Sequence, residues 1–277
     1  MLTESSQVET ITFLHWEMPR WAYMWGIAVA MFAFLKGLTL RWARADATLA
    51  RKAAYLLLWP GMDANRFLSG ISPAPERGEW LAAATKTIIG VFLVALSQRL
   101  SHPLAGGWVA MIGIVLLLHF GLFHLLSCFW RSQGVDAPRL MNRPLLASSI
   151  SAFWSRHWNV AFRDITHRLV FLPLRHSIGP GAAVFCGFLF SGLLHELVIT
   201  VPAGGGYGGP TLFFALQGLA LLAERTQPAH RIGLGKGFKG WLFVQTLLIV
   251  SAPLLFPPAF VIRVINPFIQ FLHGLAP

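Results

Sequence analysis

Long apolar segments alternate with short polar segments along most of the chain. A helix needs about 20 mainly apolar residues to cross the hydrocarbon core of a bilayer. The segments that reach or approach this length are Trp21–Leu40, Trp80–Gln98, Leu104–Leu126, Pro180–Val201, Tyr207–Ala223 and Trp241–Ile262. The fifth is short, and the last contains Pro253, Pro257 and Pro258, which predict a kink or a break. The pattern predicts an all-α, polytopic transmembrane helix bundle of about six spans.

Two other apolar segments are not expected to span the membrane. The stretch "YLLLWPGMD" at 55–63 is too short, so we interpret it as a re-entrant or interfacial element. In the region Leu145–His176, aromatic residues recur at helical spacing with arginines between them. This pattern predicts an amphipathic helix that lies on the membrane surface.

Composition supports a membrane protein. The chain is 55% hydrophobic and 12% charged, whereas soluble domains carry about 25% charged residues. The excess of 22 Lys and Arg over 11 Asp and Glu falls in the segments between spans, which argues against a nucleic-acid-binding protein. Basic loops usually stay in the cytosol. We therefore expect 41–52, 127–178 and 225–239 to be cytosolic and both termini to lie on the opposite side.

The remaining bulk features predict one membrane-embedded unit. We expect a single domain over 1–277, without a cleavable signal peptide. A multi-pass protein of a bacterial inner membrane fits this pattern of loops. Cys128 and Cys186 are the two cysteines, and they suggest neither a disulfide framework nor a cysteine metal site. Nothing in the sequence indicates an oligomeric state.

A histidine ends a stripe of small residues in the fourth apolar segment. Ala183, Gly187, Ser191 and His195 follow one another at steps of four, so on a helix they share one face. Small residues let a neighbouring backbone come close, and we expect His195 to face protein or a cavity. It is either a packing histidine bonded to a neighbouring carbonyl or a functional group. A neutral imidazole in a dry site suits general-base work on a hydroxyl.

Several familiar sites are excluded. In "HELVI", Ile199 stands where a zinc protease needs its second histidine, and there is no G-x-S-x-G nucleophile motif. His119 and His124 are five residues apart without a carboxylate cluster, so we predict no metal site. The glycine run "AGGGYGG" lacks the residues of a phosphate loop, and we interpret it as a flexible turn.

Two motifs carry a family resemblance. "SAFWSRHWN" at 151–159, followed by "SGLLHEL" at 191–197, resembles the wax synthase branch of the membrane-bound O-acyltransferases. "YLLLWPGMD" and "FGLFHLLS" extend the resemblance more weakly. It implies that a fatty acyl group moves from acyl-CoA, a co-substrate, to the hydroxyl of a lipid alcohol. No resident cofactor is implied. His195 matches the catalytic histidine, and Asn159 matches the motif asparagine.

This resemblance implies roles for the neighbouring residues. His195 would take the hydroxyl proton, and Asn159 would orient a reactant or bind the developing oxyanion. Trp158 and Ser191 would contact substrate. Arg156, Arg163 and Arg175 would hold the phosphates of CoA or contact anionic headgroups of membrane lipids. Glu196 would point about 100° away from His195, and we expect it to form a structural salt bridge.

Two other hypotheses remain open. The chain is shorter than typical family members, so a peripheral span is expected to be missing, and His157 stands where an arginine is frequent. Some wax-synthase-like relatives are membrane terpene cyclases, in which Glu196 or Asp164 would act as the acid and aromatic rings would stabilise cations. In the second hypothesis the chain is a non-catalytic membrane protein or a transporter, and His195 lines a polar path.

Overall fold

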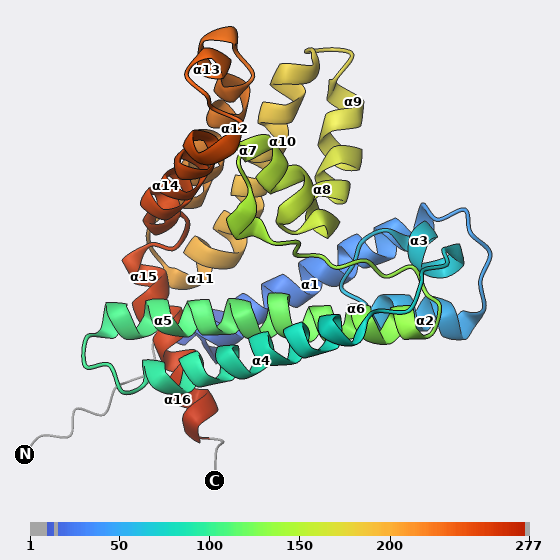
Figure 1. The fold of residues 1–277 in the computed structure, drawn as a ribbon. Helices are drawn as coiled ribbons and strands as arrows, with labels where there is room; N and C mark the ends of the chain where they lie inside the picture. Colours follow the sequence, from blue (N-terminus) through green and yellow to red (C-terminus); the bar gives the residue numbers. More distant parts are fainter. Residues whose placement is uncertain (1–9, 14–15, 275–277) are drawn as a thin grey trace, which may run out of the picture.

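Helices make up most of the protein. The computed structural model describes residues 10–13 and 16–274 (Figure 1). Near the N-terminus a short antiparallel pair is formed by β1 (Thr10–Phe13) and β2 (Trp16–Pro19). The N-terminus, which we expected on the side opposite the basic loops, begins with residues that lie outside the described ones.

Five helical segments are long and apolar enough to cross a membrane, which confirms the all-α polytopic fold. They are α1 (Arg20–Arg41), α4 (Arg77–Ser97), the continuous rod α5–η1–α6 (Pro103–Ser132), the rod α10–η5–α11 (Pro180–Ala203) and α14 (Gly237–Leu255). The remaining predicted span is α12 (Gly209–Glu224), an apolar helix of 16 residues. Its length is below that of a full membrane crossing.

The chain breaks after α14, as the prolines predict. The helix runs through Pro253 and ends at Leu255. The chain then continues as α15 (Pro258–Phe260), η6 (Val261–Ile265) and α16 (Asn266–Gly274). Pro257 and Pro258 lack the N–H groups that would continue the helix.

The long helices form two groups (Figure 1). In the first, α4 packs along α5 (Pro103–Val115), η1 (Leu116–Leu122) and α6 (Phe123–Ser132). In the second, α12 packs between α10 (Pro180–His195) and α14. Helix α1 contacts both η5 (Glu196–Thr200) and η6, and η6 contacts α5. The two groups are therefore joined through α1 and the C-terminal segment.

The short segment at 55–63 ends one helix and leads to the next. It comprises the end of α2 (Leu49–Leu58) and the turn before α3 (Ala64–Ser69). Tyr55 and Trp59 are buried with Phe67, and burial raises the pKa of Tyr55 to about 12. Leu49 and Leu57 of α2 are exposed, as on a helix at a membrane surface.

Lys36 is not at the surface. A lysine near the end of an apolar span is expected to extend its amine toward water, but the side chain of Lys36 is 1% exposed. Its Nζ donates a hydrogen bond to the Gly61 carbonyl at 2.7 Å and lies over the Tyr55 ring. The expectation is wrong because the turn after α2 covers this face of α1 and supplies an acceptor and an aromatic face.

The region Leu145–His176 is not one amphipathic helix. It is divided into η2 (Pro144–Leu146), α7 (Ile150–Ala152), η3 (Phe153–His157), α8 (Val160–Thr166), η4 (His167–Phe171) and α9 (Leu172–Leu174). The main break comes at Asn159, whose φ is 40°. Asparagine adopts this left-handed conformation more readily than most residues. The break turns η3 toward the interior, where Phe153 is buried beside Leu221 of α12.

Candidate active site

His195 lies at the last turn of α10, and its imidazole is oriented by the helix itself. The Nδ1 atom is 2.7 Å from the carbonyl oxygen of Ser191. A carbonyl oxygen only accepts, so Nδ1 must carry the proton and donate it. In the neutral ring, Nε2 then keeps its lone pair. The geometry therefore presents a proton acceptor at Nε2.

Two phenylalanines pack against this imidazole. The ring of Phe214 from α12 lies 4.6 Å from it between centroids. The ring of Phe162 from α8 lies 6.3 Å away, nearly perpendicular to it. These contacts surround a partly buried imidazole with apolar groups. Such apolar surroundings limit the contact of the ring with water.

The predicted stripe of small residues does face protein. Ala183, Gly187 and Ser191 are buried on α10. A Cβ atom built at Gly187 would lie 3.0 Å from Thr166 of α8, so the small residue allows the two helices to approach. The Ser191 hydroxyl donates to the Gly187 carbonyl at 2.9 Å. Ser191 therefore shapes the helix beneath the histidine, and its predicted contact with substrate stays a prediction.

Glu196 begins the π-helical turn η5 and does not orient His195. One carboxylate oxygen accepts hydrogen bonds from the Thr211 backbone N–H at 3.1 Å and from the Thr211 hydroxyl at 3.0 Å. The other accepts from the Thr200 hydroxyl. Among the described residues these contacts replace the salt bridge that we expected. They fasten η5 to the start of α12, which also positions Phe214.

Asn159 forms the N-cap of α8. Its side-chain oxygen accepts the backbone N–H of Phe162 at 3.2 Å, and its own N–H points to the Met141 sulfur at 3.2 Å. Phe162 is also the residue whose ring meets His195. The asparagine is thus linked to the histidine through one helical turn, with its amide NH₂ group not used in the cap.

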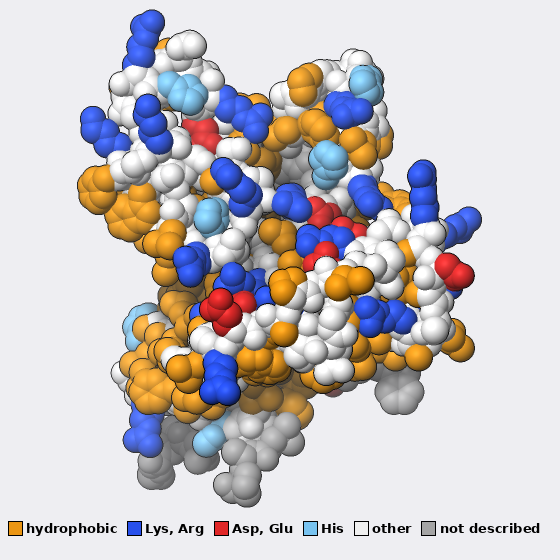
Figure 2. All heavy atoms as spheres, turned by 45° about the vertical axis from the view of Figure 1, so that its right-hand side comes forward, with side chains coloured by type: hydrophobic (Ala, Val, Ile, Leu, Met, Phe, Trp, Pro, Cys, Tyr) orange, Lys and Arg blue, Asp and Glu red, His pale blue; other side chains and the backbone are white. Residues whose placement is uncertain are grey.

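Trp158 and Arg156 lie next to this turn in sequence, whereas Arg175 follows α9, before the start of α10 and therefore at the opposite end of that helix from His195. Trp158 stacks on Phe153 at 5.7 Å between centroids and also approaches Phe120. Arg156 is exposed. Figure 2 shows Lys and Arg side chains spread over the two protrusions formed by the α9–α10 and α12–α14 connections and around the hollow between them. This basic surface suits an anionic ligand.

Two of the arginines already have partners. Arg163 donates to the Asp164 carboxylate through Nε at 2.8 Å and to the Ser155 carbonyl. Arg175 donates to the neighbouring His176 ring at 3.0 Å. A phosphate would have to compete with a carboxylate at Arg163, whereas at Arg175 it would replace a neutral acceptor. Arg156 and Arg175 are therefore better placed than Arg163 to bind an anion.

Sequence reasoning missed the polar face of α12. Gln217 is fully buried, donates to the Ser251 hydroxyl at 3.2 Å and accepts from the Trp154 indole N–H at 3.4 Å. The Trp154 ring lies 5.4 Å from Phe214, which contacts His195. The sequence did contain an indication of this face: Gln217 and Glu224 are polar residues seven positions apart in an otherwise apolar helix.

The second of these polar residues is Glu224. Its carboxylate is 4% exposed and accepts the backbone N–H groups of Ile150 at 2.8 Å and Ser151 at 2.6 Å. These are unpaired donors at the start of α7. Helix α12 therefore binds residues 150–154 through Glu224 and Gln217. The same helix places Phe214 against His195.

Another cluster offers metal-ligand atoms. Glu79, His124 and Cys128 bring one such atom each within 4.8 Å of one another. However, Arg131 pairs with the Glu79 carboxylate at 2.7 Å and Arg139 lies 3.6 Å from it. The positive charges of these two guanidinium groups would repel a metal cation at this carboxylate. We interpret the cluster as an ion-pair network that joins α4 to α6.

A shallow cavity of about 540 Å³ opens beside Glu196. Its lining is mainly apolar and comes from the start of α12 and the preceding turn: Glu196, Tyr207, Gly208, Thr211, Leu212 and Ala215. His195 is not among these residues, because neighbouring positions on a helix point in different directions.

Known proteins resemble the part of the chain that contains His195. Residues 137–216 match the model of the membrane bound O-acyl transferase family. These residues include Asn159, His195 and Phe214. Over these residues the chain is similar to this family.

The named relatives are plant acyltransferases. Probable long-chain-alcohol O-fatty-acyltransferase 1 of Arabidopsis thaliana is 33% identical over 207 residues, which cover 66% of this chain and 56% of the relative. Probable long-chain-alcohol O-fatty-acyltransferase 9 is 30% identical over 141 residues, 46% of this chain and 41% of the relative. Diacylglycerol O-acyltransferase 1-1 of Oryza sativa subsp. japonica is 28% identical over 128 residues, 42% of this chain and 24% of the relative.

These similarities confirm the resemblance that the two motifs predicted. The chain spans about half the length of the first two relatives, with 41% and 56% covered. They agree with an integral membrane protein, but plant relatives do not support the bacterial inner membrane that we expected.

Proposed function

We propose that the protein transfers a fatty acyl group from acyl-CoA to the hydroxyl of a lipid alcohol, with His195 as the general base. The observation that carries the proposal is the hydrogen bond from Nδ1 to the Ser191 carbonyl, which leaves Nε2 as a proton acceptor between two phenylalanine rings. The family match and the alcohol acyltransferases among the relatives support the reaction class.

The reaction needs one proton acceptor that later becomes a donor. Nε2 removes the proton of the alcohol while the alcohol oxygen attacks the thioester carbonyl carbon. The tetrahedral intermediate then expels the thiolate of CoA. The imidazolium returns the proton to this sulfur, so free CoA and an ester leave and the base is regenerated.

Asn159 is our candidate for the oxyanion. Its side-chain oxygen is used as the cap of α8, which fixes the direction of the amide. The NH₂ group can donate to the oxygen that gains charge in the tetrahedral intermediate. A single such donor contributes about 3–4 kcal/mol in other acyl-transfer enzymes.

The cyclase hypothesis receives less support from the geometry. One group of aromatic rings lies around His195 and Trp154, and another joins Tyr55, Trp59, Phe67 and Trp130. Of its candidate acids, Asp164 is paired with Arg163, and Glu196 is held by Thr200 and Thr211. Both carboxyl groups are therefore already engaged as hydrogen-bond acceptors, whereas a cyclase needs a protonated acid that is free to donate its proton.

A thiol-release assay tests the proposal. Purified protein in lipid vesicles receives acyl-CoA and a long-chain alcohol, and both free CoA and ester are measured. His195→Gln should lower kcat by between about a hundredfold and ten thousandfold. His167→Gln, an exposed histidine on η4, should leave kcat unchanged. Near-normal ester formation by folded His195→Gln protein would remove the histidine from the mechanism.

A further inference from the structure

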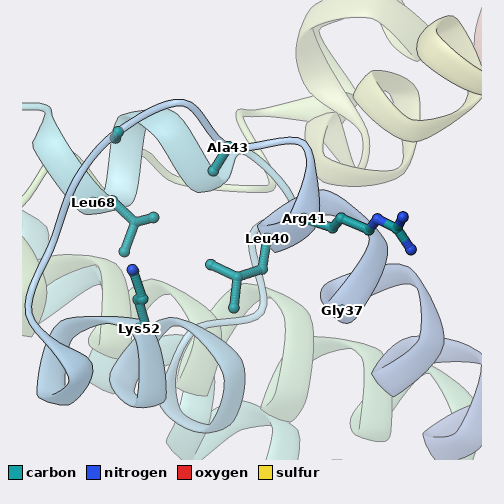
Figure 3. Close-up of a pocket in the computed structure, with 7 residues that line it drawn as sticks. Gly37, Leu40, Arg41, Ala43, Lys52 and Leu68 are labelled. Carbon is teal, nitrogen blue, oxygen red and sulfur yellow. The ribbon is translucent and has the colours of Figure 1, made fainter.

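A cavity of about 380 Å³ lies where the end of α1 meets α2 and α3. We call it the Lys52 cavity, and its lining is Gly37, Leu40, Arg41, Ala43, Ala45, Lys52 and Leu68. Figure 3 shows Lys52 rising from α2 toward Leu68, Leu40 between them and the α1 backbone, and Arg41 extending away from the cavity.

Its charge is entirely positive. The lining contains two cations and no acidic residue. Arg41 ends α1, where a basic side chain complements the helix dipole. Lys52 lies near the start of α2, where the dipole disfavours a cation. Among the described residues, Nζ of Lys52 has no hydrogen bond or ion pair, so its charge is available to an external anion.

The walls of the Lys52 cavity are apolar. Leu40, Leu68, Ala43 and Ala45 belong to one hydrophobic cluster around Phe67. An inorganic anion would pair with the Lys52 amine but would make no apolar contact with these walls. An amphiphile with an anionic head and a hydrocarbon part matches both the amine and the walls.

The surroundings place this cavity at the membrane surface. It sits at the end of a helix that is long and apolar enough to span. Phe34 on α1 and Leu49 and Leu57 on α2 are exposed, as expected for side chains in contact with lipid. A lipid headgroup at this level lies within reach of Lys52.

We propose that the Lys52 cavity binds the headgroup of an anionic phospholipid. The phosphate contacts Nζ of Lys52, Arg41 contributes at the rim, and the adjoining hydrocarbon lies against Leu40 and Leu68. The same hydrophobic cluster includes Ala161 and Ile165 of α8. A bound lipid therefore stabilises the support on which α8 rests, whatever reaction the protein catalyses.

Lipid titrations test this proposal without any activity assay. Phosphatidylglycerol and phosphatidylcholine with the same acyl chains are titrated into detergent-purified protein, and lipid binding and the melting temperature are measured. Phosphatidylglycerol should bind more tightly and raise the Tm. Lys52→Gln should weaken its binding about fivefold, which corresponds to one lost contact of a basic residue. Lys239→Gln, at an exposed lysine of α14, is the matched control.

A second variant separates a defined site from diffuse attraction. Ala43→Leu fills the Lys52 cavity without a change of charge, so it should also weaken binding of phosphatidylglycerol. Equal effects of Lys52→Gln and Lys239→Gln would overturn the proposal. So would displacement of the lipid by free CoA, because the cavity would then bind the phosphates of CoA. If Ala43→Leu lowers the Tm in the absence of lipid, the two lysine variants decide the question.

Discussion

Two helix pairs of the molecule, α4–α5 and α10–α12, pack closely through glycine residues. In the α4–α5 pair, a Cβ built at Gly113 would lie 2.9 Å from the Gly90 carbonyl oxygen. In the α10–α12 pair, a Cβ at Gly192 would lie 2.7 Å from Thr211 Cα. Glycine brings backbones together in both pairs. The second pair adds a carboxylate bonded to Thr211 and an imidazole against Phe214.

The polar groups at the α10–α12 contact distinguish it from the α4–α5 contact, which we describe by close packing alone. Small residues at a helix contact indicate close approach, and the α4–α5 pair shows that this is compatible with a purely structural role. Polar groups inside the close contact are the informative feature, because each is costly in a membrane protein unless it is satisfied or functional. In the α10–α12 pair, Glu196 is satisfied by threonines, whereas Nε2 of His195 has no described partner.

The largest effect expected beyond His195 concerns Asn159. Aspartate also tolerates a positive φ and keeps the oxygen that caps α8, but it has no amide NH₂ group. If that group binds the oxyanion, Asn159→Asp should lower kcat by about a hundredfold to a thousandfold with little change in Tm. Asn142→Asp, at an exposed loop position, serves as the control. Full activity of Asn159→Asp would assign the residue to capping alone.

The glycines provide the direct test of the comparison. Gly90→Ala should lower the Tm and the yield of folded protein, because its Cβ would meet the Leu117 backbone at 2.5 Å. Its remaining folded protein should keep kcat. Gly192→Ala should lower kcat in the folded fraction as well, since it pushes Thr211 from Glu196 and moves Phe214.

The Cβ atom added by Gly26→Ala on α1 would meet nothing within 4 Å, so this control should change neither the Tm nor kcat. We expect the two damaging substitutions to cost about 1–3 kcal/mol of unfolding free energy, as overpacking usually does. Equal loss of kcat per folded molecule in Gly90→Ala and Gly192→Ala would erase the distinction between the pairs.

A smaller effect is expected at Gln217. Gln217→Leu removes the acceptor of the Trp154 indole and should lower kcat/KM about tenfold, in line with one buried donor left unpaired. Because the two residues act through one contact, Trp154→Phe combined with Gln217→Leu should cost less than the sum of the single changes. Additive losses in this double-mutant cycle would show that Gln217 does not act through Trp154.

The smallest effect concerns the exposed arginines. Arg156→Glu with Arg175→Glu should raise the KM for acyl-CoA by about fivefold per residue at most, because solvent-exposed ion pairs contribute about 1 kcal/mol or less. The value of kcat should stay unchanged. Arg231→Glu in the exposed end of α13 (Gln227–Arg231) is the control, and an unchanged KM in the double variant would favour contact with lipid headgroups.

The sequence was sufficient for five of the six predicted spans and for the face that His195 occupies. Apolar length and the prolines near 257 act locally, so they predicted both the helices and the break after α14. The stripe that ends at His195 was predicted for the same reason, since helical spacing decides which residues share a face.

Other features depended on distant partners. The position of Lys36 is set by the Gly61 carbonyl and the Tyr55 ring, which local hydropathy does not contain. The break at Asn159 interrupts a regular helical pattern through one positive φ. The role of Gln217 could have been suspected from a lone amide in an apolar helix, but Trp154 as its partner required the fold.

The hydrogen bond between His195 and the Ser191 carbonyl has a consequence for how this protein responds to its bilayer. The acceptor belongs to the main chain, so no side-chain replacement at position 191 can delete it, and Ser191→Ala would leave the imidazole's proton on Nδ1. A change in the curvature of that last turn would alter this support for the ring. Membrane thickness, which tilts and bends spanning helices, would then act on the orientation of the His195 imidazole.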